Sequence, residues 1–180
     1  MKFKRIIGID PGATGGIAYS PDATIQSTKV VKMPSDFQST NQFIKDITPG
    51  MDDTLCILEK ITMHPNIARD PAKAMRLQKL IRNHEQLKTL LQVHHIKVIE
   101  VTPSSWQSEL SLKLKGRAAK EETREQRKNR YKKFASSKFP QIKATLWNSD
   151  ALILLYLGMF KNEFHPTWIW DKLPPEQIEF

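Results

Sequence analysis

The alternation of apolar and polar positions predicts three short β-strands in the first part of the chain. Residues 5–10, 16–20 and 24–33 are runs of apolar or β-branched residues, and Pro-Gly and Pro-Asp dipeptides separate them. Such dipeptides favour tight turns, and the short apolar runs between them favour strands. The pattern therefore predicts an antiparallel meander of three strands.

The middle of the chain alternates between helical and extended patterns. Residues 40–47 favour a short helix, and residues 55–59 form an apolar run typical of a strand that is buried on both faces. Residues 71–92 place leucine and isoleucine at helical spacing, and residues 96–101 favour another strand, which Pro103 ends. A meander followed by alternating helices and strands predicts an α/β domain with mixed strand pairing.

The last third of the chain has two further helical patterns. One covers residues 120–137 after a break at Gly116, and the other begins at Asn148 or Ser149 and ends at Phe160. We therefore expect the final helix to be capped by one of these two polar side chains.

Length and patterning predict one domain, residues 1–160, and a tail, residues 161–180. The tail contains Trp168 and Trp170, and its pattern predicts irregular structure. It either packs on the domain or contacts a partner.

Composition excludes several classes of protein. The hydrophobic fraction of 39% is ordinary for a folded domain, and the longest apolar run, residues 151–160, is too short to cross a bilayer. No secretory signal pattern is present, and the single Cys56 lies within an apolar run. We expect a cytoplasmic protein that does not associate with membranes.

Positive charge is concentrated in one segment of the chain. Residues 112–138 contain eleven lysines and arginines and three glutamates, a net charge of +8 out of +9 for the whole chain. Such concentration is typical of a surface that binds a polyanion, although a solvated helix with many charges is the alternative.

Three carboxylates occupy positions that the predicted topology brings together. Asp10 ends the first strand, Glu59 ends the fourth, and Asp150 opens the final helix. With a crossover helix between them, the first and fourth strands can be neighbours in the sheet. Taken singly, the three residues also fit a turn, a strand end and a helix cap. Together they suit Mg²⁺ or Mn²⁺, because hard cations prefer carboxylate oxygens.

Two such ions in one site would support phosphodiester hydrolysis. A pair of ions about 4 Å apart activates a water molecule and stabilises the leaving oxygen. The glycines near Asp10 do not form a phosphate-binding loop, because no Gly-Lys-Ser or Gly-Lys-Thr follows them.

Four motifs in this order resemble the RuvC-type Holliday junction resolvases of the RNase H-like superfamily. They are Ile-Gly-Ile-Asp-Pro-Gly at 7–12, Leu-Glu at 58–59, Val-Thr-Pro-Ser-Ser-Trp at 101–106 and Ser-Asp-Ala-Leu at 149–152. The resemblance extends to about Phe160, and the small, divergent chain looks like a phage-borne member. It implies an RNase H-like fold, in which helices flank a mixed five-stranded sheet.

The resemblance also implies an activity and a site. It implies a homodimer that makes paired, metal-dependent incisions in four-way DNA junctions, with Asp10, Glu59 and Asp150 as catalytic metal ligands. RuvC-type enzymes usually have another acidic residue or a histidine about three positions before the last aspartate. Here either Asn148 donates an oxygen, the fourth ligand comes from elsewhere, or three carboxylates suffice.

Basic and aromatic residues provide candidates for DNA contacts. By position, the resemblance suggests Lys143 as a contact to the scissile phosphate, and Phe37 or His64 as a side chain inserted near the junction centre. The other candidates for the DNA-binding surface are basic residues of the positive segment: Lys113, Lys115, Arg117, Lys120, Arg124, Arg127, Lys128 and Arg130.

Two other functions remain open at this stage. The first is an RNase H-like nuclease that acts on other branched substrates or on RNA–DNA hybrids. The second is a catalytically inactive protein that binds junctions, which Trp147 in place of an acidic residue favours.

Overall fold

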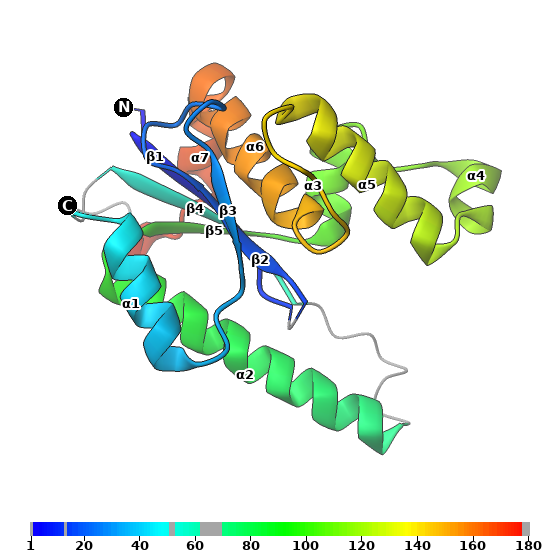
Figure 1. Ribbon diagram of the computed structural model, residues 1–180, viewed down its shortest axis with the longest axis horizontal. Helices are drawn as coiled ribbons and strands as arrows, with labels where there is room; N and C mark the ends of the chain where they lie inside the picture. The colour runs from blue at the N-terminus through cyan, green and yellow to red at the C-terminus, as the bar shows by residue number, and fades with distance from the viewer. Residues whose placement is uncertain (1, 13, 51–52, 62–69, 178–180) are drawn as a thin grey trace.

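The sheet has the strand order β3-β2-β1-β4-β5 in the computed structural model, which describes residues 2–12, 14–50, 53–61 and 70–177 (Figure 1). β1, β2 and β3 pair antiparallel, whereas β1 with β4 and β4 with β5 pair parallel. The predicted mixed five-stranded sheet is confirmed. Its strands are β1 (Arg5–Asp10), β2 (Gly16–Ser20), β3 (Lys29–Lys32), β4 (Thr54–Glu59) and β5 (Lys97–Val101).

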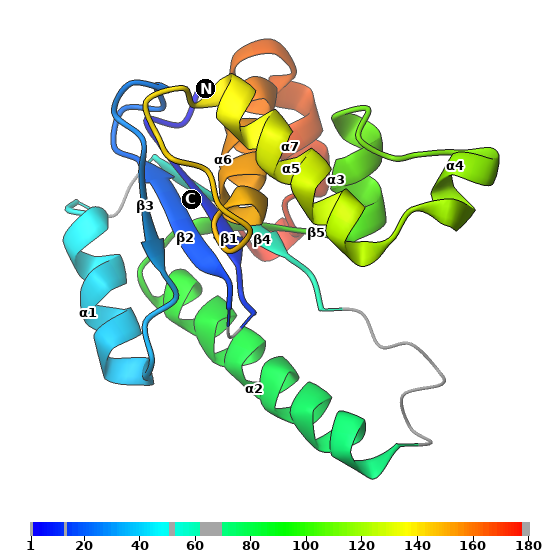
Figure 2. The same cartoon turned by 45° about the vertical axis from the view of Figure 1, so that its right-hand side comes forward.

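Helices cover both faces of this sheet. α1 and α2 lie against one face, and α6 lies against the other with α3, α5 and α7 around it, while α4 projects from the body (Figures 1 and 2). No described helix is long and apolar enough to span a membrane. The helices are α1 (Phe37–Ile47), α2 (Pro71–Val93), α3 (Pro103–Glu109), α4 (Gly116–Glu121), α5 (Arg124–Lys138), α6 (Ser149–Phe164) and α7 (Pro166–Lys172), followed by the 3₁₀ turn η2 (Pro175–Gln177).

The two faces of the sheet bury two separate hydrophobic clusters. Successive side chains of a strand point to opposite faces, so Ile6 packs in the cluster with α6, whereas Ile7 packs with Leu87 and Leu91 of α2. β4 is buried along almost its whole length, as its unbroken apolar run predicts.

α6 approaches β1 closely because Gly8 has no side chain. A Cβ atom on Gly8 would lie 2.2 Å from the backbone nitrogen of Leu155 and 2.5 Å from the carbonyl oxygen of Ala151. The side chains of α6 from Ala151 to Leu155 are fully buried. This close contact holds the first turn of α6, and with it Asp150, beside the end of β1.

Replacing Gly8 by alanine is expected to destabilise the fold, because the new methyl group overlaps backbone atoms that cannot rotate away. Overpacking of this kind costs about 1–3 kcal/mol, and more where backbone must shift. The free energy of unfolding, measured by urea titration of both proteins, gives the difference directly. An unchanged midpoint and slope would show that α6 is less closely packed than the structure has it.

The third strand is shorter than predicted. Only Lys29–Lys32 of the predicted segment 24–33 is extended, because Asp22 folds the preceding residues into a turn. Its carboxylate accepts hydrogen bonds from the backbone nitrogen and the hydroxyl of Thr24 at 3.0 and 2.8 Å. A hydrogen bond from the Ser27 hydroxyl, together with these two, holds the pKa of Asp22 down at about 2.

Helix boundaries differ from the predictions where a capping side chain acts. α1 begins three residues earlier than expected, because Asp36 accepts a hydrogen bond from the backbone of Ser39. The predicted helix 120–137 is wrong as one element, because Thr123 and Gln126 form a capping box that begins α5 after α4 has ended. α3, which Thr102 caps, was not predicted.

The C-terminal segment is helical where irregular structure was predicted. α6 continues four residues beyond Phe160, and α7 includes both tryptophans of the tail. Ile169 is buried in the cluster on the α6 face, and the ring centroid of Trp170 lies 5.6 Å from that of Phe3. The boundary between domain and tail after residue 160 stays a prediction, although these contacts join the two parts.

Candidate metal centre

Asp10, Glu59 and Asp150 converge at one edge of the sheet. Each carboxylate offers an oxygen atom, and these atoms all lie within 4.8 Å of one another. β1 and β4 are parallel neighbours in which Ile9 pairs with Leu58, so Asp10 and Glu59 follow side by side. Asp150 reaches them from the first turn of α6. The expected convergence of the three residues is therefore present, and their role stays a prediction.

A tight turn after β1 orients the Asp10 side chain. The backbone nitrogen of Gly12 donates a hydrogen bond of 3.0 Å to Oδ1 of Asp10. Gly15 closes the turn so tightly that a Cβ atom there would lie 2.2 Å from the carbonyl oxygen of Asp10 and 2.8 Å from its carboxyl carbon. The glycines near Asp10 therefore act as turn residues, as their pattern indicates.

Trp106 is a residue of the site whose role the sequence did not reveal. Its indole nitrogen donates a hydrogen bond of 3.4 Å to Oε1 of Glu59, and its buried ring packs edge-on against Tyr131 at 5.1 Å. Trp106 ends the motif at 101–106, so the motif marks a residue that positions Glu59. No spacing rule within a single sequence links these two residues.

Lys128 brings a positive charge into contact with the carboxylate cluster. Its Nζ lies 2.5 Å from Oδ2 of Asp150, whose side chain is 8% exposed. The sequence placed Lys128 among the candidates for DNA contact, and the structure brings it from α5 into the carboxylate cluster. Since Lys128 carries one positive charge against three carboxyl groups, the cluster is not neutralised when all three are ionised.

Burial and mutual repulsion disturb the ionisation of two of these groups. The pKa of Asp10 is raised by burial and by the charge of Asp150, while the hydrogen bond from Gly12 opposes that rise. Burial, with the charges of Asp10 and Asp150, raises the pKa of Glu59 to about 8. Ionised carboxylates this close together need a cation.

The donor set fits a hard divalent cation. Mg²⁺ and Mn²⁺ bind carboxylate oxygens and retain waters for a phosphate substrate. A bound ion would supply the positive charge that the cluster lacks, so Asp10, Glu59 and Asp150 are the residues that would hold it. Among the described residues, this cluster is the one group of three or more acidic, histidine or cysteine side chains with that geometry.

The side chains of Asn148 and Trp147, shortly before Asp150, are engaged by other parts of the protein. Oδ1 of Asn148 accepts a hydrogen bond of 2.7 Å from the backbone of Thr145, and its amide nitrogen donates to the carbonyl of Lys143 at 3.2 Å. Trp147 packs against Gly16, where a Cβ atom would come within 3.0 Å of its ring. The amide oxygen of Asn148 is therefore occupied by the backbone rather than directed to the carboxylates.

A cavity of about 440 Å³ opens beside the carboxylates. It lies between the Asp10 turn, the first turns of α5 and the segment that precedes α6, so a ligand in it touches Asp10 and Lys128 together. The residues that line it are Asp10, Thr14, Arg124, Glu125, Lys128, Leu146 and Trp147.

The basic candidates for DNA contact differ in whether their side chains already form ion pairs or hydrogen bonds within the protein. Arg130 donates to both carboxylate oxygens of Glu122, at 2.8 and 2.9 Å, and to the carbonyl of Leu112, so it ties α5 to the preceding segment. Arg117 pairs with Glu121 at 2.6 Å.

The other candidates are distributed as follows. Lys113 donates to Ser104 at 2.6 Å, and Arg124 lines the cavity at the carboxylates. Lys143 is exposed on the segment before α6. Phe37 is exposed at the start of α1, whereas His64 lies outside the described residues. The remaining basic candidates, all exposed on the segment from the end of α3 to α5, are Lys115, Lys120 and Arg127.

Comparison with known proteins identifies the fold. No protein-family model matches the sequence. No curated protein matches it. Among solved structures, Thermus thermophilus RuvC in complex with a Holliday junction substrate matches with a TM-score of 0.54 and 12% identity, over 89% of this chain and 96% of that chain. A further Thermus thermophilus RuvC structure matches with a TM-score of 0.53 and 13% identity, over 87% and 94%. The chain therefore has the RNase H-like fold, with helices flanking a mixed five-stranded sheet.

Proposed function

We propose that the protein is a metal-dependent endonuclease that resolves four-way DNA junctions by paired phosphodiester hydrolysis. The observation that carries this proposal is the cluster of Asp10, Glu59 and Asp150 within 4.8 Å, of which Asp10 also lines a cavity together with Arg124 and Lys128 of α5. The fold shared with a RuvC that is bound to a junction supports it. Phage origin is part of the same proposal, resting on the size and divergence of the chain.

The proposed chemistry assigns a task to each residue. Asp10, Glu59 and Asp150 would hold Mg²⁺ or Mn²⁺, two ions per site, and the metal would supply an activated water and a positive charge for the leaving oxygen. Trp106 keeps Glu59 oriented through the indole hydrogen bond. Lys128 lines the cavity and pairs with Asp150, so its ammonium would be a donor to an oxygen of a phosphate held there.

DNA binding is assigned to α5 and the segment before it. Arg124 and Lys128 face the cavity, so they contact the phosphates nearest to the cut. The exposed candidates Lys115, Lys120 and Arg127 contact the flanking backbone, which gives affinity without sequence preference. Paired incisions need two metal centres, which a homodimer of this chain supplies.

Replacing Arg124 by alanine is expected to weaken DNA binding and to reduce its dependence on salt. Each lost phosphate contact lowers the slope of log K against log[salt] by about 1. Lys133 is the matched control, because it is an exposed cation on the same helix, about 180° around the helix axis from Arg124. Fluorescence anisotropy between 50 and 300 mM salt measures both slopes. Equal slopes for Arg124→Ala and Lys133→Ala would contradict the proposed DNA surface.

A catalytically inactive junction-binding protein is the second candidate. The engagement of Asn148 with the backbone favours it, because this region then adds no fourth oxygen to the three carboxylates. The inactive protein would bind junctions through the same basic surface and would cut none of them.

A panel of substrates separates these functions. The protein is incubated in Mg²⁺ or Mn²⁺ with a mobile four-way junction, a linear duplex, a flap and an RNA–DNA hybrid. Symmetric nicks confined to the junction support the proposal. Preference for the flap or the hybrid assigns the site to another branched or hybrid substrate, and tight binding without cutting in either metal identifies the inactive binder.

A further inference from the structure

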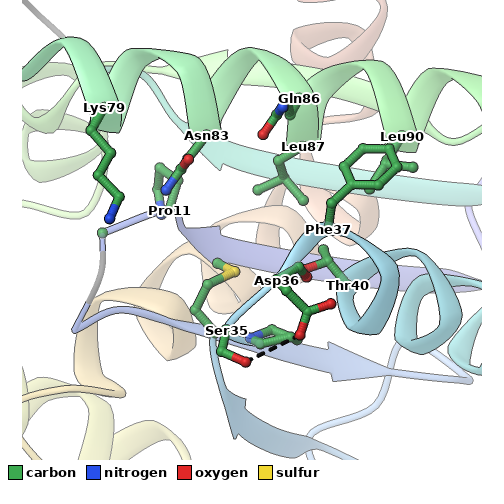
Figure 3. A pocket seen from close by; sticks show the side chains of 13 residues that line it. Pro11, Ser35, Asp36, Phe37, Thr40, Lys79, Asn83, Gln86, Leu87 and Leu90 are labelled. Carbon is green, nitrogen blue, oxygen red and sulfur yellow. Dashed lines mark hydrogen bonds between the residues drawn. The ribbon is translucent and has the colours of Figure 1, made fainter.

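The contacts that hold the carboxylate cluster in place come from the α6 face of the sheet. Trp106 of α3 bonds to Glu59, and Lys128 of α5 bonds to Asp150. On the other face, the turn after β1 borders a cavity of about 320 Å³ between α2 and the segment that leads into α1 (Figure 3). The orientation of these carboxylates therefore depends on the helices of the α6 face.

α3 carries one of these contacts, although it is a short helix with a single buried side chain. It has 7 residues, and of these only Trp106 is buried. Isolated helices of this length are unstable in water, because nucleation costs more than a few hydrogen bonds return. The direction of the Trp106 indole, and with it the 3.4 Å bond to Glu59, therefore depends on what else holds α3 to the body.

Glu109, the last residue of α3, is bound by α6 and α7 at once. Its Oε2 accepts a hydrogen bond of 2.7 Å from Nζ of Lys161 on α6, and its Oε1 accepts one of 3.2 Å from the indole nitrogen of Trp168 on α7. The three helices lie side by side (Figure 2). Both carboxylate oxygens are therefore engaged, and they fix the end of α3 that lies one turn after Trp106.

The Lys161 ammonium is largely withdrawn from water, which makes this link difficult to displace. The Lys161 side chain is 9% exposed, and its Nζ lies 5.1 Å from the ring centroid of Trp168. The bond from Lys161, joined by the bond from Trp168, lowers the pKa of Glu109, so this carboxylate is ionised at neutral pH. A shift of α3 would leave a buried charge without its partner, which is strongly unfavourable.

We propose that Glu109, Lys161 and Trp168 are positioning residues that act through α3 and hold the Trp106 indole on Glu59. This inference rests on the proposed function for the role of Glu59 as a metal ligand. No residue of α7 lines the cavity at the carboxylates, so the C-terminal segment acts on the metal centre from a distance. Groups that hydrogen-bond a metal ligand fix its orientation, and their loss weakens metal binding by about 10- to 100-fold.

The test follows the Trp106 indole and the metal affinity in proteins that remain folded. Glu109→Ala combined with Lys161→Met removes both charges together, so no buried ammonium is left without a partner. In the metal-free double variant, the ¹⁵N–¹H signal of the Trp106 indole, assigned with Trp106→Phe, is expected to move toward its position in Glu59→Ala. The Kd for Mg²⁺, measured by calorimetric titration, is expected to rise about tenfold.

Two further variants separate positioning from the stability of the tail. Trp170→Leu is the matched control, because this ring also belongs to α7 but packs against Phe3. It is expected to lower the free energy of unfolding in urea, while the Trp106 signal stays in place and the Kd stays within about twofold of the parent. Trp168→Phe keeps the ring beside Lys161 and removes only the bond to Glu109, so it is expected to move the signal less than the double variant does.

The outcomes decide the inference apart from the function. If the Trp106 signal of the double variant stays at the parent position, or if the Kd for Mg²⁺ is unchanged, the inference is overturned. Equal effects of Trp170→Leu and the double variant also overturn it, because loss of stability would then explain both. If signal and Kd change as expected while the parent cuts no junction, the positioning residues stand and the nuclease function fails.

Discussion

Replacing Asp10 by asparagine is expected to lower the rate of junction cleavage on the order of 1,000-fold and to leave junction binding intact or tighter. The substitution removes a charged oxygen from the carboxylate cluster at the end of β1. Losses of about 100- to 1,000-fold follow removal of one electrostatic contact at a reacting group, and a metal ligand is at the upper end. Binding is preserved because one negative charge near the DNA phosphates disappears.

Single-turnover cleavage and anisotropy binding measure the two effects separately. Asp46→Asn is the matched control, because Asp46 is an exposed carboxylate on α1 that bonds to Gln42 and lies outside the cluster. Its cleavage rate is expected to equal that of the parent. A cleavage rate of Asp10→Asn within tenfold of the parent rate would show that Asp10 is not a catalytic metal ligand and would contradict the proposed mechanism.

The affinity for Mg²⁺ is expected to rise steeply with pH up to about 8. Burial, aided by the charges of Asp10 and Asp150, raises the pKa of Glu59 to about 8, so the metal-free protein holds a proton on Glu59 at neutral pH. A metal ion binds the ionised form and must displace that proton. Relative to pH 8, where half of Glu59 is ionised, binding is therefore expected to be about fivefold weaker at pH 7 and about 50-fold weaker at pH 6.

Calorimetric titration with Mg²⁺ in two buffers of different ionisation enthalpy gives both the affinity and the number of protons released. Near pH 7, the parent is expected to release about one proton per binding event, since Glu59 gives up its proton when the metal binds. Glu59→Gln has no proton to release at that position and is expected to bind more weakly with a shallower pH dependence. An affinity that stays constant between pH 6 and pH 8 would contradict the assignment of Glu59 as a ligand.

The sheet and two of the site residues could be predicted because local patterns determine them. The sequence pattern has a meander, then a crossover helix, then the apolar run 55–59, and this order predicts the parallel pairing of β1 with β4. Neighbouring parallel strands end at the same edge of the sheet. Asp10 and Glu59 are the residues at those ends. Asp150 was placed correctly because its helix is apolar all round and must pack on the sheet.

The parts that were missed depend on contacts between distant segments. The ion pair of Lys128 with Asp150 joins α5 to α6 across the cluster, so a count of charges could assign Lys128 only to a general basic surface. The hydrogen bond from Trp106 to Glu59 crosses 47 positions of sequence. The turn before β3 and the break between α4 and α5 are both set by hydrogen bonds from one or two side chains to nearby backbone, a weaker signal in a sequence pattern than periodicity.

Paired resolution of a four-way junction by this protein is tested most directly by cleavage of a supercoiled plasmid that extrudes a cruciform. The first nick releases the supercoiling and removes the cruciform, so linear product forms only when both strands are cut within the lifetime of one complex. We expect linear plasmid as the main product in Mg²⁺ or Mn²⁺, and none with Asp10→Asn. Nicked circles alone, or intact plasmid in both metals, would contradict paired resolution of the junction by this protein.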